Sequence, residues 1–322
     1  MRILVFLLML VASLTASAQP YPSKPIRYIV PYPPGGAADI VARAVGQKLS
    51  ESFGVPVVVD NRSGAGGNLG TDLVAKTAPD GHTLLMGNVG PLAISVSLNR
   101  KLPYDPLTDL APVSMMVIYP NVLVVYPGLP AKSVSELVAY AQGQAKARAK
   151  PLAYASAGTG SSTHLAAELL KSMAGIDMAH IPYKGGGQAI VDVMSGQVPM
   201  YFSSALGALP HIKSGKLRAL GVTSAKRSRA IPELPTIAES GFPGYEAVNW
   251  VGLLVPARTR GDIIARLNGE IVRIFRQPDV EERLAAQGGE AETNTPAQFT
   301  AQLRSEIKKW AQVIKASAMQ LE

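Results

Sequence analysis

Glycine-rich segments recur at four places in the sequence, each between an apolar run and a helical pattern. They read PPGG at 33–36, NRSGAGGNLG at 61–70, SAGTGSSTH at 156–164 and YKGGGQA at 183–189. A helix start leaves backbone N–H groups unpaired and carries partial positive charge. Glycine lets a ligand approach this backbone because no side chain stands in the way. The chemistry that these segments suggest is the capture of acceptor oxygens.

The four turns can meet at one place. Ligands of open α/β sheets bind in the crevice at the ends of the parallel strands. Two of the turns fall in a first predicted lobe and two in a second, so all four point into one cleft if the lobes face each other. Hydroxyl groups add donors there, from Ser156, Thr159, Ser161, Ser162 and Thr163. The pattern predicts a site for a small anion, most plausibly with one or two carboxylates.

Each feature of these turns also has a purely structural interpretation. One glycine-rich turn is most often a tight connection, so only the array carries weight. Asp39 suits the first turn of a helix, and we expect it to hold the Gly35-Gly36 loop in shape rather than touch an anion. His164 can be structural or a ligand donor, Lys184 can pair with a carboxylate or be solvated, and Asn88 can be a cleft amide or a turn former.

The motifs of common enzyme and cofactor sites are missing from the sequence. It has no Gly-x-Ser-x-Gly elbow and no Gly-Lys-Ser/Thr phosphate loop, and the run at 64–70 misses the dinucleotide fingerprint. The four histidines lack HxH or HExxH spacing, and the chain has no cysteine. We therefore predict no catalytic residue, no cofactor and no metal.

The first 18 residues have the order of a cleavable secretory signal peptide. Arg2 precedes an apolar run at 3–14, and Ala16-Ser17-Ala18 precedes Gln19. The apolar run is too short to span a membrane, and the lack of cysteine excludes a lipid anchor at the cleavage point. We expect the mature chain to be free in the periplasm of a Gram-negative bacterium, as a monomer.

Charge gives little sign of a nucleic-acid partner. The chain has 31 basic and 23 acidic residues, and loss of Arg2 with the signal peptide leaves 30 and 23, a net charge of +7. The basic residues are scattered, with short clusters only at 146–150 and 226–229, and few aromatic residues lie among them. We expect a solvated surface that can still attract small anions.

From Ile26 onward, short β-rich runs alternate with helical patterns, which is typical of a parallel α/β sheet. The helix around Ile40 carries an apolar stripe and stops near Gly54, so it packs on a sheet. Capping boxes at 133–136 and 295–298 open two further helices. Strands are predicted at 26–31, 55–60, 82–87, 113–126, 152–156, 178–183, 200–204, 217–223 and 248–255.

Two stretches are predicted to cross between lobes. Residues 112–127 are long for one strand and are broken at Tyr119-Pro120-Asn121, as expected where a strand leaves one sheet for another. The return lies between Ser224 and Val255, in a segment rich in proline and glycine. We predict two α/β lobes with parallel or mixed sheets around a central cleft. Residues 22–121 begin the first lobe, 122–227 form the second, and 228–322 complete the first.

Five segments resemble, in the same order, the signatures of the Bug family. They are VPYPPGGAADIVAR, DNRSGAGGNLGTDLVAKTAPDGHTLL, YASAGTGSSTHLAAELL, IPYKGGGQAIVDVMSGQV and ELPTIAESGFPGYE, and the resemblance runs from about Tyr21 to the last helix. Bug proteins are periplasmic solute receptors of tripartite tricarboxylate transporters. The resemblance implies a type II periplasmic binding-protein fold, capture of a small organic anion by lobe closure, and delivery to the membrane subunits of the transporter.

The resemblance also implies which residues hold the ligand. It places a carboxylate against the loop at 35–37, with Ser156, Thr159 and either Ser162 or His164 opposite. Many members carry an acidic residue after 196–198 to sense the far end of the ligand, whereas this chain reads PMYFSS at 199–204, which disfavours an amino acid. The predicted binding residues are Gly35, Gly36, Ala37, Asp39, Gly66, Gly67, Asn68, Asn88, Ser156, Gly158, Thr159, Ser162, His164, Tyr183, Lys184, Gly185, Ser203 and Ser204.

Two functions from other classes stay open at this point. One is a secreted hydrolase of small esters that uses a serine within 156–162. The other is a two-lobed sensor that presents its ligand to a receptor kinase. The ligand itself also stays open among mono-, di- and tricarboxylates, aromatic acids and uncharged amides.

Overall fold

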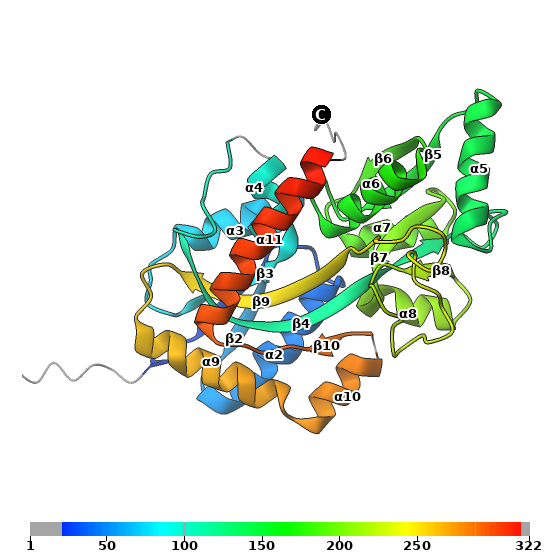
Figure 1. The fold of residues 1–322 in the computed structure, drawn as a ribbon. Coiled ribbons are helices and arrows are strands. Elements are labelled where there is room, and N and C mark those ends of the chain that lie inside the picture. Colours follow the sequence, from blue (N-terminus) through cyan, green and yellow to red (C-terminus); the bar gives the residue numbers. More distant parts are fainter. Residues whose placement is uncertain (1–20, 99–100, 287, 317–322) are drawn as a thin grey trace, which may run out of the picture.

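The structure is a computed structural model that describes residues 21–98, 101–286 and 288–316 (Figure 1). The predicted signal peptide lies outside these residues. The strands are β1 (Ile26–Val30), β2 (Val57–Asn61), β3 (Thr83–Asn88), β4 (Leu110–Val125), β5 (Leu152–Ser156), β6 (Met178–Pro182), β7 (Met200–Ser204), β8 (Arg218–Val222), β9 (Val248–Pro256) and β10 (Glu290–Ala291).

The helices flank this sheet on both faces. They are α2 (Ala37–Phe53), α3 (Asn68–Ala75), α4 (Ser95–Leu98), α5 (Val134–Lys146), α6 (Ser162–Ala174), α7 (Gly186–Met194), α8 (Ala205–Lys213), α9 (Gly261–Phe275), α10 (Pro278–Ala286) and α11 (Pro296–Ala316). Two short segments, the 3-10 turn η1 (Ala65–Gly67) and the π-helical turn η2 (Gly90–Ile94), lie next to α3 and α4. All nine predicted strands are present within three residues at each end, and β10 was not predicted.

The strands form two mixed half-sheets that share β4. The first lobe has the order β2-β1-β3-β9-β4, with β10 on the far side of β4. The second has the order β6-β5-β7-β4, with β8 on the far side of β4. In each half, three strands run parallel and β4 runs antiparallel to its neighbours.

Strand β4 is continuous through the crossing, which corrects the predicted break at Tyr119-Pro120-Asn121. It pairs with β9 as far as Pro120 and with β7 from Asn121 onward. Proline has no N–H to donate to a strand ladder. Because Pro120 stands where β4 exchanges one partner for the other, the strand tolerates it without ending.

Three apolar cores follow from this arrangement. One lies on a single face of both half-sheets, under α3, α5, α6 and α11. The second core lies between the other face of the first lobe and helices α2 and α9. The third core lies between the other face of the second lobe and helices α7 and α8. In Figure 1, α11 crosses the first lobe on the face opposite α9. Buried Phe299 and Trp310 fix it there, as predicted for the last helix.

Local signals set the helix ends. Helix α2 ends at Gly54, whose φ of 69° is left-handed. Ser133 Oγ accepts the Glu136 N–H at 3.1 Å to open α5. At α11, Thr295 Oγ1 accepts the Gln298 N–H at 3.3 Å and Gln298 Oε1 accepts the Thr295 N–H at 2.9 Å. The predicted capping signals are confirmed.

Candidate ligand-binding site

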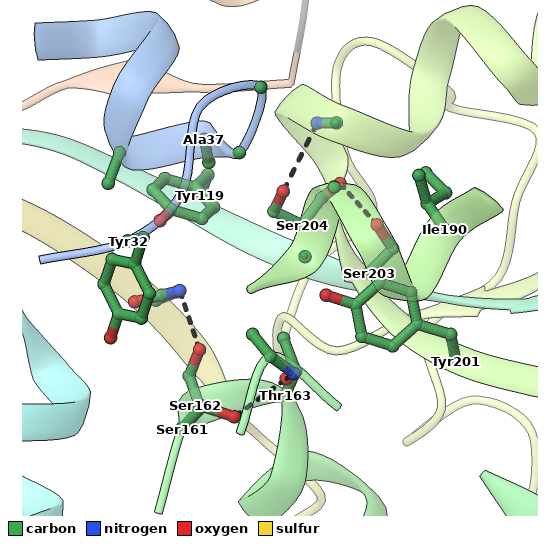
Figure 2. A pocket seen from close by; sticks show the side chains of 18 of the residues that line it. Tyr32, Ala37, Tyr119, Ser161, Ser162, Thr163, Ile190, Tyr201, Ser203 and Ser204 are labelled. Atoms are coloured by element: carbon green, nitrogen blue, oxygen red, sulfur yellow. Dashed lines mark hydrogen bonds between the residues drawn. The ribbon is translucent and has the colours of Figure 1, made fainter. Parts of the chain in front are cut away.

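A cavity of about 100 Å³ lies between the two lobes, beside the crossing strands. Four helix starts surround it: α2 from the first lobe, and α6, α7 and α8 from the second. Figure 2 shows Ala37 of α2 facing Ser204, which caps α8, with Ser162 and Thr163 of α6 and its capping residue Ser161 below them. The lining residues are Tyr32, Gly35, Gly36, Ala37, Ala38, Asn88, Tyr119, Ala157, Ser161, Ser162, Thr163, Gly186, Gly187, Ile190, Tyr201, Ser203, Ser204, Gly207, His211 and Asn249.

The four helix starts differ in whether a side chain caps them. Ser161 Oγ accepts the His164 N–H at α6, and Ser204 Oγ accepts the Gly207 N–H at α8, both at 3.3 Å. Helices α2 and α7 have Gly36 and Gly185 at the capping position, and no side chain caps either of them. Their first N–H groups therefore stay available to an acceptor that reaches the cavity, one set from each lobe.

Asp39 braces the loop before α2. Its carboxylate accepts hydrogen bonds from the Gly35 N–H at 3.0 Å, from Arg43 Nε at 3.0 Å and from Asn61 Nδ2 at 2.9 Å. Burial raises the pKa of Asp39, but the hydrogen bonds from Arg43, Gly35 and Asn61 outweigh it, and the net pKa is lowered. The carboxylate is thus ionised and fully engaged. The Gly35 N–H is used internally, so the donors left on this loop begin at Gly36.

A chain of hydrogen bonds joins the lobes along the cavity wall. Asn249 Nδ2 donates to Ser162 Oγ at 2.7 Å, and Asn88 Nδ2 donates to Asn249 Oδ1 at 2.8 Å. Asn88 Oδ1 in turn accepts from the Tyr32 hydroxyl at 3.1 Å and from the Gly90 N–H at 3.0 Å. This chain fixes the orientation of both amides, so the cavity wall is organised before a ligand enters.

The lining is neutral apart from the helix ends. Burial raises the pKa of Tyr32, Tyr119 and Tyr201 well above the ordinary value, so their hydroxyls stay protonated and can donate. Among the described lining residues there is no Asp, Glu, Lys or Arg. A site with N–H and O–H donors and without carboxylates suits an anion.

The comparisons place this architecture in a family. Residues 41–319 match the tripartite tricarboxylate transporter family receptor, TctC. The chain belongs to this family.

Protein BugT of Bordetella pertussis (strain Tohama I) is 42% identical over 307 residues, 95% of this chain and 93% of BugT. The structure of R. palustris Rpa4515 with adipate has a TM-score of 0.89 and 34% identity, over 92% of this chain and 98% of that one. The structure of the periplasmic binding protein BugD has a TM-score of 0.89 and 31% identity, over 94% and 100%.

The chain is therefore a solute-binding receptor with a mixed α/β periplasmic binding-protein fold, and it is not an enzyme. The predicted family and fold class are confirmed, and the hydrolase alternative is set aside. No helix among the described residues is long and apolar enough to cross a membrane.

The receptor distributes its predicted binding residues over two cavities. Gly35, Gly36, Ala37, Asn88, Ser162, Ser203 and Ser204 line the cavity just described. Gly66, Asn68, Gly158, Thr159, Tyr183 and Lys184 line a second one of about 350 Å³. Asp39, Gly67, Ser156, His164 and Gly185 are in neither lining.

The turn at 61–70 is a contact between the lobes. A Cβ placed on Gly66 would lie 2.4 Å from the Thr159 carbonyl oxygen of the second lobe. A Cβ on Gly158 would lie 3.4 Å from Cα of Gly66 in the first lobe. These glycines allow backbone to approach backbone where the lobes touch. The turn at 61–70 is therefore not one of the four helix starts at the first cavity. The fourth one is the start of α8, which follows β7.

His164 and Ser156 support the turn before α6 from behind. His164 Nδ1 accepts the Gly160 N–H at 3.2 Å, and its ring stacks on His180 with ring centroids 4.0 Å apart. Ser156 Oγ lies 2.6 Å from His180 Nε2 and accepts the Gly158 N–H at 3.1 Å. Ser156 and His164 thus hold backbone in place, and neither lines the first cavity.

Sequence reasoning missed Tyr32, Tyr119, Ile190, Tyr201, Gly207, His211 and Asn249 as lining residues. Tyr32 directly precedes the predicted loop, and Asn249 is a polar residue in the apolar strand 248–255. Both features were visible signals. The other residues come from the middles of strands and helices, where no local pattern marks a ligand site.

Proposed function

We propose that this receptor captures a small organic acid through a carboxylate held between the lobes, and delivers it to the membrane subunits of a tripartite tricarboxylate transporter. One observation carries the proposal: four helix starts meet at a cavity whose described lining has no acidic side chain. A bound carboxylate would accept N–H bonds from those helix starts in a site that is favourable for negative charge.

Both lobes would share the carboxylate. The first lobe offers the N–H groups around Gly36 and Ala37, and the second offers those of Gly186 and Gly187 with the Thr163 hydroxyl. A ligand that bonds to both lobes binds the closed form more tightly than the open form, and so shifts the population toward closure. The closed form is the state that a membrane partner would recognise.

The similarity to R. palustris Rpa4515, whose structure holds adipate, supports an acid as the ligand. The segment 1–18 has the features of a signal peptide, which supports action in the periplasm as a free monomer. Capture returns the ligand unchanged, so no cofactor, metal or nucleic acid takes part.

Gly36→Val tests the site directly. The φ of Gly36 is −86°, and a Cβ there would meet no atom within 4 Å, so the fold should accept valine. The side chain would stand at the uncapped start of α2 and should weaken carboxylate binding by at least about tenfold, the loss of a charge-assisted hydrogen bond. Calorimetry with the acid that most raises the melting temperature, chosen from a mono-, di- and tricarboxylate panel, gives the measurement.

Gly261→Val is the matched control. Gly261 begins α9, another helix start without a side-chain cap, has open space for a Cβ, and lines neither cavity described above. It should bind like the wild type. Equal affinity of the Gly36→Val variant and the wild type would refute the proposed site, and a panel without any binding acid would refute the ligand class.

A further inference from the structure

His211 faces the cavity without an assigned role. Its main-chain oxygen accepts hydrogen bonds at the end of α8, from the Ser214 hydroxyl and from the Lys216 and Leu217 N–H groups. No side chain or backbone group among the described residues is hydrogen-bonded to its ring. The ring is half-buried and lines the cavity. An imidazole in such a place has its donor free for a ligand.

Helix α8 separates His211 from the helix starts. Ser204 caps the helix, and Gly207 and His211 follow on the face that lines the cavity. With a rise of 1.5 Å per residue, His211 lies about 10 Å along the axis from Ser204. The imidazole and the capping position of α8 therefore line the cavity at two separate places.

The cavity lining beside α8 includes a glycine and an apolar side chain. A Cβ on Gly207 would lie 3.2 Å from Ser204 Oγ and 3.9 Å from Ser203 Oγ, so a larger residue would crowd these two hydroxyls. Ile190 of α7 lines the same cavity and supplies apolar surface (Figure 2). A chain of methylene groups fits this stretch better than a polar linker does.

We infer that His211 is the specificity-determining residue for the far end of the ligand, where it favours a second carboxylate over a methyl group. The inference rests on the proposed carboxylate site at the helix starts. The first carboxylate occupies those starts, methylene groups pass Ile190 and Gly207, and the second carboxylate accepts the imidazole N–H.

Calorimetry with acids matched in length tests the assignment. The pairs are butyrate and succinate, hexanoate and adipate, and octanoate and suberate. The wild type should bind at least one diacid more tightly than its monoacid. His211→Ala, which has no side-chain N–H to donate, should lower affinity for that diacid about tenfold and change affinity for the monoacid less than twofold. His211→Lys should keep the diacid preference.

Lys213→Gln is the matched control. It removes a positive charge two residues away on the same helix, from an exposed side chain that lines neither cavity described above, and should leave the preference unchanged. The assignment is overturned if His211→Ala keeps the wild-type preference, if it weakens binding of both acids of a pair equally, or if the wild type prefers monoacids. If no acid of either kind binds the wild type, the proposed carboxylate site fails as well.

Discussion

His164 must stay neutral for the turn before α6 to keep its shape, because a ring protonated at Nδ1 cannot accept the Gly160 N–H. Burial lowers the pKa of His164 to about 4, and burial together with the nearby His164 lowers the pKa of His180 to about 4. Histidine in an unfolded chain titrates near 6.5. Between about pH 4 and about pH 6.5, the unfolded chain therefore binds more protons than the folded chain.

The stabilising effect of the neutral pair is complete above about pH 6.5 and is lost as the pH falls toward 4. From pH 7 to pH 5, we expect His164 alone to lower the free energy of unfolding by about 2 kcal/mol. Urea unfolding at several pH values measures this. A variant with His164→Asn and His180→Asn should show a flatter pH dependence than the wild type. An equally steep dependence in that variant would place the acid sensitivity elsewhere.

Single residues also show how far sequence reasoning reaches. Asp39 could be predicted as a brace because its partner Gly35 is only four positions away, within one turn of a helix start. Asn88 could be proposed but not explained, because its amide donates to Asn249, 161 positions along the chain. The contact exists only after β3 and β9 pair. A contact between residues close in the sequence can be predicted from one sequence. A contact that depends on the order of the strands in the sheet cannot.

The same limit decides which helix starts meet at the cavity. Four glycine-rich turns were predicted to do so, but the turn at 61–70 lies against the second lobe instead. Strand β7, which leads into α8, pairs directly with the crossing strand β4. Strand order therefore brings α8 to the cavity. The Ser203–Ser204 pair at its start was predicted only from a resemblance.

Gly66→Ala should hinder lobe closure. The new Cβ would collide with the Thr159 carbonyl oxygen, which belongs to the other lobe, so each lobe can fold but their contact is disturbed. A clash of this kind costs of order 1–3 kcal/mol, and we expect ligand affinity to fall about tenfold. Calorimetry with the acid identified for the wild type measures the loss.

The strain of a left-handed residue must be separated from the clash. Gly54 has a φ of 69°, close to the 65° of Gly66, lies in the same lobe and has open space for a Cβ. Both Gly54→Ala and Gly66→Ala should therefore lower the free energy of unfolding by about 1 kcal/mol. Only Gly54→Ala should leave ligand affinity unchanged. If Gly66→Ala and Gly54→Ala bind the acid with equal affinity, the contact between residue 66 and Thr159 does not control closure.

On the scale of the whole molecule, Thr223 joins the two segments that cross between the lobes, in addition to the ladder between β4 and β9. Thr223, fully buried, donates its hydroxyl to the Ala247 carbonyl at 2.7 Å and accepts the Asn121 N–H at 2.8 Å. Asn121 belongs to β4, and Ala247 leads into β9. We expect the lobes to turn about this region when the cleft opens, which would separate Gly66 from Thr159.

A ligand that bridges the lobes should shorten distances across the cleft and leave distances within a lobe unchanged. The chain has no cysteine, so two introduced cysteines carry spin labels without background. Leu69 in the first lobe and Val191 in the second are exposed, and we expect the Leu69→Cys, Val191→Cys pair to give a shorter distance when the acid is bound. Met173→Cys with Val191→Cys reports within the second lobe and should not respond. Identical distance distributions across the cleft with and without a saturating acid would mean that the receptor captures its ligand without closing.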